Sequence, residues 1–340
     1  MPVHVRHVGA WKEAKALHIR HNGVWKPIQA AYIRQGGVWK QYYAAERVVT
    51  LSSSVSPIIK SFFSAADWGD ANLRKVVIIP PGVEIGANYT GHALATSDSA
   101  SGQPGSWAGE LVIENYGTIS GIGGAANSGV GGTALLVTFK GRNGELATVN
   151  NYGTLRGGGG GGGRGGQGGA GQVGYEFSEG PFYSATTSGY IATRYTNGTW
   201  FYRWNGTIIG NGVGNPYLSG GWYYTNGAQQ SGQGHQVRRY QTRYNSTTGG
   251  AGGAGARGQG FDGNAGTGAN GAAGGTNAGA GGKGGNGGAW GAAGQTGATG
   301  AAGNVGSGTA GATGGLGGAY LNGRANCTLN NSGTVLGRQI

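Results

Sequence analysis

Seven carboxylates between residues 47 and 156 are the side chains best suited to acid–base chemistry. Two carboxyl groups a few ångströms apart can protonate a leaving group and activate water. The seven are Asp67, Asp70, Glu84, Asp98, Glu110, Glu114 and Glu145. None forms a recognisable acid–base pair by spacing, and no Gly-Lys-Ser/Thr follows the glycine run 157–163 as a phosphate loop requires. The sequence predicts no catalytic residue and no enzyme. A carboxylate pair hidden on a β-helix is the alternative that spacing leaves open.

Metal-binding chemistry has two sources, four N-terminal histidines and one cysteine. The histidines are His4, His7, His18 and His21. His-x-x-His on a strand points its two rings to opposite faces, so the spacing lacks a coherent set of ligands. The single cysteine, Cys327, excludes an internal disulfide and a zinc–cysteine cluster. We therefore predict no metal site and no cofactor, and we expect Cys327 to be buried.

Residues 175–248 have the composition of contact loops. They hold 16 of the 33 aromatic residues, with five arginines and no lysine. Tyr, Trp, Arg, Ser, Gly and Asn are the residues of antibody-like binding surfaces. The candidates for receptor contact are Trp200, Tyr202, Arg203, Trp204, Trp222, Tyr223, Tyr224, Arg238, Arg239 and Tyr240. Asn-Gly pairs at 197–198, 205–206, 211–212 and 226–227 predict turns. The alternative is a small β domain whose aromatic residues form its own core.

A basic repeat of 14 residues occurs three times in residues 1–46. Each copy reads Arg-x-x-Gly-x-Trp-Lys, and its turn pair predicts a β-hairpin with a Trp on the return strand. Stacked hairpins could share a row of tryptophans, because one hairpin alone is marginal. Docking onto a larger assembly is the better interpretation, ahead of nucleic-acid binding. The anchor candidates are Trp11, Trp25, Trp39, Arg6, Arg20 and Arg34.

Residues 47–156 alternate short apolar runs with turns, which predicts a β domain holding the hydrophobic core. A rung-like unit ends it and returns at the C-terminus. The three copies are Ile113-Glu-Asn-Tyr-Gly-Thr-Ile-Ser-Gly121, Val149-Asn-Asn-Tyr-Gly-Thr-Leu-Arg-Gly157 and Leu329-Asn-Asn-Ser-Gly-Thr-Val-Leu-Gly337. The third copy lies 180 residues beyond the second. If the copies are neighbouring rungs of a β-solenoid, the segment between them must leave and return at one place. We expect residues 327–340 to close the domain.

Glycine makes up 81 of the 340 residues, and two tracts, 157–174 and 249–326, hold most of the excess. Between Gly288 and Gly306 glycine falls at every third position. That period fits a left-handed extended helix of three residues per turn, whose backbone groups must pair with neighbouring helices. We predict an ordered bundle of polyglycine II-type helices, against the alternative of a flexible linker. The expected fold is mainly β with almost no α-helix, and its β region is a β-solenoid or a β-sandwich.

The order of these segments resembles bacteriophage tail-tip and minor tail proteins. The rung motifs Asn115-Tyr-Gly-Thr118, Asn151-Tyr-Gly-Thr154 and Asn331-Ser-Gly-Thr334 run into glycine tracts that are similar to the polyglycine adhesins of T-even-like tail fibres. The resemblance implies a tail-fibre adhesin that displays loops on a glycine bundle and grips the bacterial surface. One long aromatic insert replaces the several short loops of those adhesins.

We therefore expect a phage receptor-binding protein on the virion tail, exposed to the medium. Its partners would be other tail proteins, at the N-terminal region, and a bacterial surface protein or glycan. We expect no nucleic acid and no membrane insertion, since no run of about 18 apolar residues occurs. A homotrimer is one alternative, although the glycine bundle needs only one chain. The second functional hypothesis is a structural tail component whose insert packs on a neighbouring virion protein.

Overall fold

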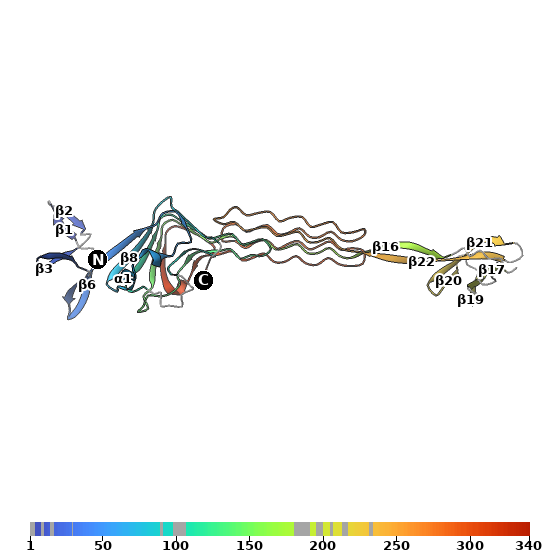
Figure 1. The fold of residues 1–340 in the computed structure, drawn as a ribbon, viewed down its shortest axis with the longest axis horizontal. Helices are drawn as coiled ribbons and strands as arrows, with labels where there is room; N and C mark the ends of the chain where they lie inside the picture. Colours follow the sequence, from blue (N-terminus) through green and yellow to red (C-terminus); the bar gives the residue numbers. More distant parts are fainter. Residues whose placement is uncertain are drawn as a thin grey trace.

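The molecule is a long rod whose parts follow one another from the N-terminal hairpins to a distal tip (Figure 1). The computed structural model describes residues 4–7, 10–13, 17–28, 30–88, 91–97, 107–179, 191–194, 200–204, 207–212, 217–230 and 234–340. Its elements are strands, apart from α1 (Ala65–Gly69) and the short 3-10 helices η1 (Ile59–Phe62) and η2 (Arg324–Asn326). The mainly β prediction is confirmed. In the described ranges no helix has the length and apolar character needed to cross a membrane.

Each 14-residue repeat is an antiparallel hairpin, as predicted. The pairs are β1 (His4–His7) with β2 (Ala10–Glu13), β3 (His18–His21) with β4 (Val24–Pro27), and β5 (Ala30–Gln35) with β6 (Val38–Thr50). Asn22 and Gly23 both have positive φ (49° and 78°), as a tight hairpin turn needs. The first turn, residues 8–9, lies outside the described residues. In all three hairpins the repeated arginine faces the repeated tryptophan across the ladder.

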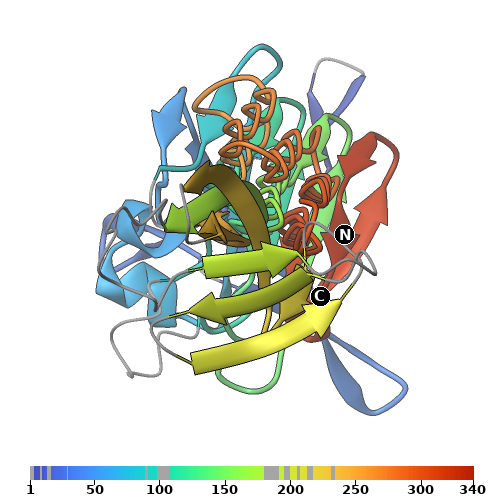
Figure 2. The same cartoon turned by 90° about the vertical axis from the view of Figure 1, so that its right-hand side faces the viewer.

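The expected shared row of tryptophans is wrong. The first two hairpins are separate two-stranded sheets, and only the third joins a larger sheet, through the long strand β6. Trp25 and Trp39 are 65% and 66% exposed. Viewed along the rod, the hairpins point to different sides of its axis (Figure 2). With no sheet in common and with both side chains mostly exposed, Trp25 and Trp39 do not form a packed row.

Residues 46–156 and 319–340 form a β-solenoid with three parallel sheets. The first sheet has the order β24 (Cys327–Asn331), β14 (Ala147–Asn151), β11 (Leu111–Asn115), β8 (Leu73–Ile79), β6, β5. The second is β25 (Thr334–Leu336), β15 (Thr154–Arg156), β12 (Thr118–Ser120), β9 (Glu84–Gly86), β7 (Ser54–Val55). The third is β10 (His92–Ala95), β13 (Thr133–Leu136), β23 (Ala319–Asn322), β26 (Arg338–Gln339). Apart from the β5–β6 hairpin, all these pairings are parallel, as in a solenoid and unlike an antiparallel sandwich.

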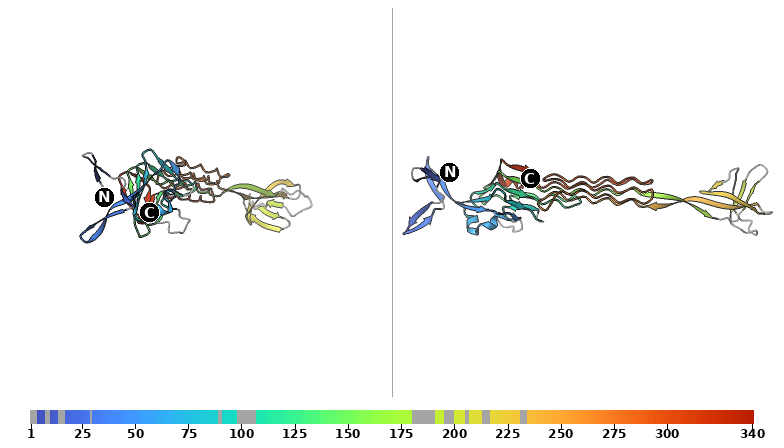
Figure 3. Two further views of the ribbon diagram at one scale, coloured as in Figure 1. Left: turned by 60° about the vertical axis from the view of Figure 1, so that its left-hand side comes forward. Right: turned by 90° about the horizontal axis from the view of Figure 1, so that it is seen from above.

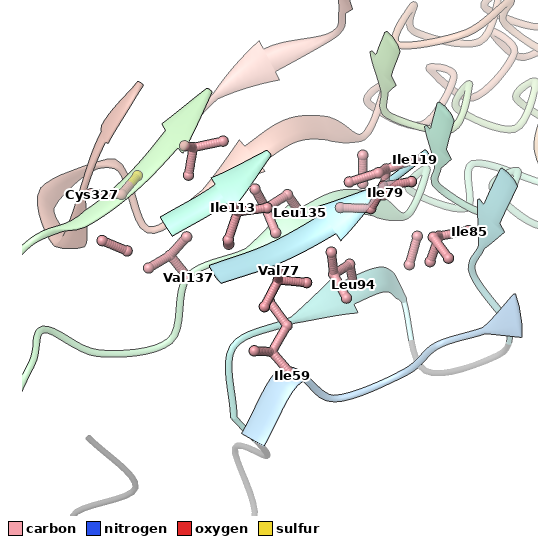
Figure 4. Packing of buried hydrophobic residues seen from close by; sticks show 14 of the residues in the cluster. Ile59, Val77, Ile79, Ile85, Leu94, Ile113, Ile119, Leu135, Val137 and Cys327 are labelled. Carbon is pink, nitrogen blue, oxygen red and sulfur yellow. The ribbon is translucent and has the colours of Figure 1, made fainter. Parts of the chain in front are cut away.

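The three rung motifs stack in register, which confirms the sequence prediction. Ile113 pairs with Val149, and Val149 pairs with Leu329. Their apolar residues point into one core, together with Ile79, Ile119 and Leu135 (Figure 4). Cys327 also lies in this core and is buried, as expected. The period-2 alternation of the strands thus places Ile113 and Val149 in the core, while Glu114 and Asn150 lie on the partly exposed outer face.

A long excursion leaves the solenoid inside one rung. It begins after β15, at Gly157, and returns at Gly318, before β23. The two ends meet at the solenoid, where a Cβ on Gly157 would overlap the carbonyl oxygen of Gly318. The C-terminal boundary differs from the expected 326, because Ala319–Asn322 already forms a strand of the third sheet.

The glycine-rich runs of this excursion lie side by side as a bundle (Figures 1 and 3). Gly159, Gly162, Gly165 and Gly168 donate their N–H groups to the carbonyls of Gln259, Ala256, Gly253 and Gly250. A second set, Gly160, Gly163, Gly166 and Gly169, donates to Ala292, Gln295, Ala298 and Ala301. The three-residue step of both sets is the one that a threefold helix requires. The glycine tracts thus form an ordered, hydrogen-bonded bundle and not the flexible linker that was the alternative. The left-handed twist of the runs stays a prediction.

The packing of the central run, residues 157–170, explains which of its positions are glycine. Near the solenoid, the loop 121–132 covers one side of it, and Gly158 and Gly161 donate to Gly132 and Gly129 on that loop. A Cβ on Gly161 would overlap the carbonyl oxygen of Ala125. Beyond the loop, the positions that continue this spacing of three carry exposed side chains: Arg164, Gln167 and Ala170. Glycine is thus required wherever a neighbouring backbone lies against the run, and other residues occur where it meets solvent.

The tip is an antiparallel sheet carried on a two-stranded ribbon. Its order is β19 (Thr207–Gly212), β18 (Trp200–Trp204), β17 (Ile191–Arg194), β22 (Gly234–Thr247), β21 (Trp222–Gln230), β20 (Tyr217–Ser219), and β16 (Gly171–Glu179) pairs with β22. The insert begins at 171 rather than 175, because Gly171 and Gly174 already belong to β16. Of the predicted Asn-Gly turns, 211–212 and 226–227 lie within strands, the latter at a bulge, and 197–198 and 205–206 lie outside the described residues.

Candidate functional site

The receptor-contact candidates fall on three strands of the tip. Trp200, Tyr202, Arg203 and Trp204 lie in β18, where the structure describes the backbone. Trp222, Tyr223 and Tyr224 begin β21, and Arg238, Arg239 and Tyr240 lie in β22. Residues directly opposite in an antiparallel pair share a face of the sheet. The register of β16, β22 and β21 therefore divides the candidates on β21 and β22 between two faces.

One face, which we call the packed face, carries Phe177, Glu179, Trp222, Tyr224, Arg239 and Arg243, together with Tyr175 and Gln241. The Arg243 guanidinium lies 3.5 Å from the centre of the Phe177 ring, and that of Arg239 lies 4.2 Å from Trp222. Such cation–π contacts each contribute about 0.5–2 kcal/mol, according to how far they are desolvated. Tyr224 is only 4% exposed. This face accordingly serves the tip's own packing, the alternative considered for the whole insert.

Arg239 is held firmly on the packed face. Its Nε and one terminal nitrogen donate to Glu179 Oε2 at 2.9 and 2.6 Å. Burial alone would lower the pKa of Arg239, but the bonds to Glu179 and Tyr224 raise it above its ordinary value. The guanidinium is therefore a fixed charge that orders β16 against β22.

The opposite face, which we call the tyrosine face, presents Glu176, Tyr223, Arg238, Tyr240, Thr242 and Tyr244. Tyr223 and Tyr240 are stacked, with ring centres 5.3 Å apart and an angle of 18° between their planes. Tyr244 is 62% exposed. Arg238 and Glu176 form an ion pair at 2.8 Å beside these rings. This face therefore exposes aromatic surface and hydrogen-bonding groups to solvent.

Sequence reasoning named the aromatic and arginine residues of the tip but not their division into two faces. Phe177, Glu176 and Tyr244 were absent from the candidates. Strict alternation along β22 would have separated Arg238, Tyr240, Thr242 and Tyr244 from the residues between them. The pairing partner of that strand, β16, could not be identified from the sequence, because 54 residues separate the two.

The anchor candidates of the second and third hairpins are exposed. Arg20, Trp25, Arg34 and Trp39 all face solvent, and for Arg6 and Trp11 the structure describes the backbone position in β1 and β2. His18 and His21 are exposed on β3. Across the described ranges, no group of three or more His, Cys, Asp or Glu side chains is placed to hold a metal ion.

The carboxylates of the solenoid are engaged in structural contacts. Glu84 accepts hydrogen bonds from Arg156 and Ser120, at 2.9 and 2.6 Å. Glu114 accepts from Asn150 at 2.8 Å. Partial burial alone would raise the pKa of Glu145, but backbone amides, its own among them, and the Asn143 side chain hold it below its ordinary value. Asp98 lies outside the described residues.

The family to which the chain belongs follows from a match to the family model "Phage tail fibre adhesin Gp38", which covers residues 46–246. The chain belongs to the phage tail fibre adhesins. The match confirms the predicted adhesin of the virion tail, and it spans the solenoid strands up to Arg156, the first glycine run and the tip. An adhesin family points to non-enzymatic receptor binding. The three N-terminal hairpins precede the matched region.

One solved structure is similar to this adhesin over most of its length. The crystal structure of the gp37–gp38 adhesin tip complex of the bacteriophage S16 long tail fiber is 16% identical, and the alignment covers 87% of this chain and 83% of that one. Its TM-score is 0.31, a loose superposition, so the family assignment rests on the family model. The search of curated proteins gave no match.

Proposed function

We propose that this adhesin attaches to the bacterial surface through the tip sheet and to its fibre through the N-terminal hairpins. The observation that carries the proposal is the position of the two surfaces at opposite ends of one rod (Figure 1). Between them, the glycine bundle closes its backbone hydrogen bonds within a single chain, so a monomer can hold the tip away from the anchor.

The N-terminal hairpins have the features of a protein interface. Trp and Arg are the residues most enriched at interface hot spots, and each hairpin places one of each opposite the other. Three copies on one chain add avidity, because binding of one hairpin raises the effective concentration of the next. The proposed partner at this end is another tail protein, because exposed tryptophans such as Trp25 and Trp39 suit a protein surface.

The test uses the labelled full chain on cells of the strain on which a phage carrying it grows. A shortened variant, in which an Asn-Gly turn replaces residues 172–246, is measured beside it. The turn can close the ribbon because Gly171 and Thr247 already pair across it. Binding by the full chain and its loss in the variant support the proposal. If the shortened chain folds and still binds, the tip is not the contact surface. If neither binds, the structural-component hypothesis takes its place.

A further inference from the structure

We propose that the tyrosine face binds a neutral oligosaccharide of the bacterial surface, laid along strand β22. This inference rests on the proposed function, because it names the class of receptor that the tip contacts. The relevant feature is a row of flat rings with hydrogen-bonding groups between them. None of the residues that carry the argument takes part in the cation–π packing of the opposite face.

Tyr244 is placed as an open platform. It stands opposite Gly174 in the ladder, and a Cβ on Gly174 would lie 3.3 Å from a ring carbon of Tyr244. The ring therefore leans over a bare backbone on one side while the residue is 62% exposed. A flat ring with a solvent-facing surface suits the apolar C–H face of a pyranose.

A second platform lies four residues along the same strand. Tyr240 stacks with Tyr223 from β21, and Tyr223 is 38% exposed. At roughly 3.3 Å per residue, Tyr240 and Tyr244 are about 13 Å apart along the strand. That is a length that a few linked sugar rings can span.

The groups around the rings favour a neutral ligand with hydroxyl groups. Arg238 and Glu176 form an ion pair on this face, so they supply donors and acceptors with no net charge. Thr242 stands opposite Glu176 and adds a hydroxyl group between the two platforms. A strongly anionic polymer would instead require unpaired cations here.

The shape of the support argues against a folded protein as the ligand. At Tyr244 the chain is only the two-stranded ribbon of β16 and β22 (Figure 3). A stable protein interface buries about 800 Å² on each partner around a fully desolvated centre. A narrow ribbon with half-exposed tyrosines offers a line of contact, which matches a linear chain of rings.

The experiment measures binding of the labelled full chain to cells of the strain on which its phage grows. Separate batches of cells are oxidised with periodate, which cleaves the vicinal diols of sugars, or digested with proteinase K. We expect periodate to reduce binding at least tenfold and the protease to leave it within twofold. Loss with protease and survival after periodate would overturn the glycan assignment while keeping the adhesin function. Absence of binding to untreated cells would overturn both.

Variants then test the face itself. Tyr244→Leu keeps a side chain over Gly174 without a planar ring, and Tyr223→Ala removes one ring of the stack. We expect each to weaken binding at least fivefold. The matched control is Tyr116→Ala with Tyr152→Ala, which removes an exposed tyrosine stack of the same kind on the solenoid, with ring centres 4.9 Å apart. Wild-type binding by both face variants, with circular dichroism showing native folding, would refute the assignment to this face.

Discussion

Asn115 and Asn151 lie one above the other inside the solenoid, and Nδ2 of the first donates to Oδ1 of the second at 2.7 Å. Asn151 in turn donates to Asn331 at 2.6 Å. The first two amides are fully buried. This ladder joins rungs that flank the whole excursion of the glycine bundle and the tip, so it fixes where the chain leaves and where it returns.

Replacing Asn151 by Ala should lower the free energy of unfolding by about 2 kcal/mol, because it removes the buried partner of Asn115 and Asn331. The measurement is chemical denaturation followed by circular dichroism. Asn330→Ala is the control, since Nδ2 of the exposed Asn330 donates a hydrogen bond to Oδ1 of Asn150 at 2.8 Å, and its loss should cost less than about 1 kcal/mol. Equal effects at the two positions would contradict the role given to the buried ladder.

Gly161→Ala should disrupt the bundle, whereas Arg164→Ala should leave it intact. Both substitutions put the same methyl group at the same phase of the central run. At 161 it would overlap the carbonyl oxygen of Ala125, and at 164 the side chain already faces solvent. We expect a loss of about 3 kcal/mol or more for the first and less than about 0.5 kcal/mol for the second. Thermal melting and limited proteolysis compare them, and equal melting temperatures would argue against the close-packed bundle.

Lys75→Met should destabilise the solenoid although methionine has a similar volume. The buried amine donates to the carbonyls of Asp70, Leu73 and Ala108 at 2.8, 2.9 and 2.6 Å. Methionine leaves these acceptors without their donor, at a cost of about 3 kcal/mol. Urea unfolding measures it, with Lys140→Met on the exposed surface as the control. A stable Lys75→Met variant would show that packing alone holds these loops.

The contribution of Glu145 to stability should depend on pH. Its folded-state pKa lies below its ordinary value, so the folded state favours the charged form. The stabilisation is therefore present above pH 4.5, the ordinary pKa, and is lost as the pH falls through the lower folded value. Unfolding of the wild type and of Glu145→Gln between pH 3 and 7 should converge at acid pH. A difference that stays constant over this range would exclude the linkage.

Elements that depend on local chemistry could be predicted from residue types alone. Turn pairs such as Asn22-Gly23 require positive φ, so the three hairpins could be read from residue types. The repeated unit around Asn115, Asn151 and Asn331 predicted both the stacked rungs and the excursion between them. Glycine at every third position predicted an ordered bundle, because only bare backbones can approach closely enough to pair.

Other features depend on contacts between residues that are distant in the chain, and local sequence does not predict them. Whether Trp25 and Trp39 stack depends on how the hairpins are oriented, and no repeat encodes that. The division of the tip into a packed face and a tyrosine face followed from the register of β16 against β22. The loop 121–132 covers the all-glycine stretch before Arg164, and this contact explains the absence of side chains there. In each case the deciding contact joins residues far apart in the chain, and local residue preferences carry no information about such pairs.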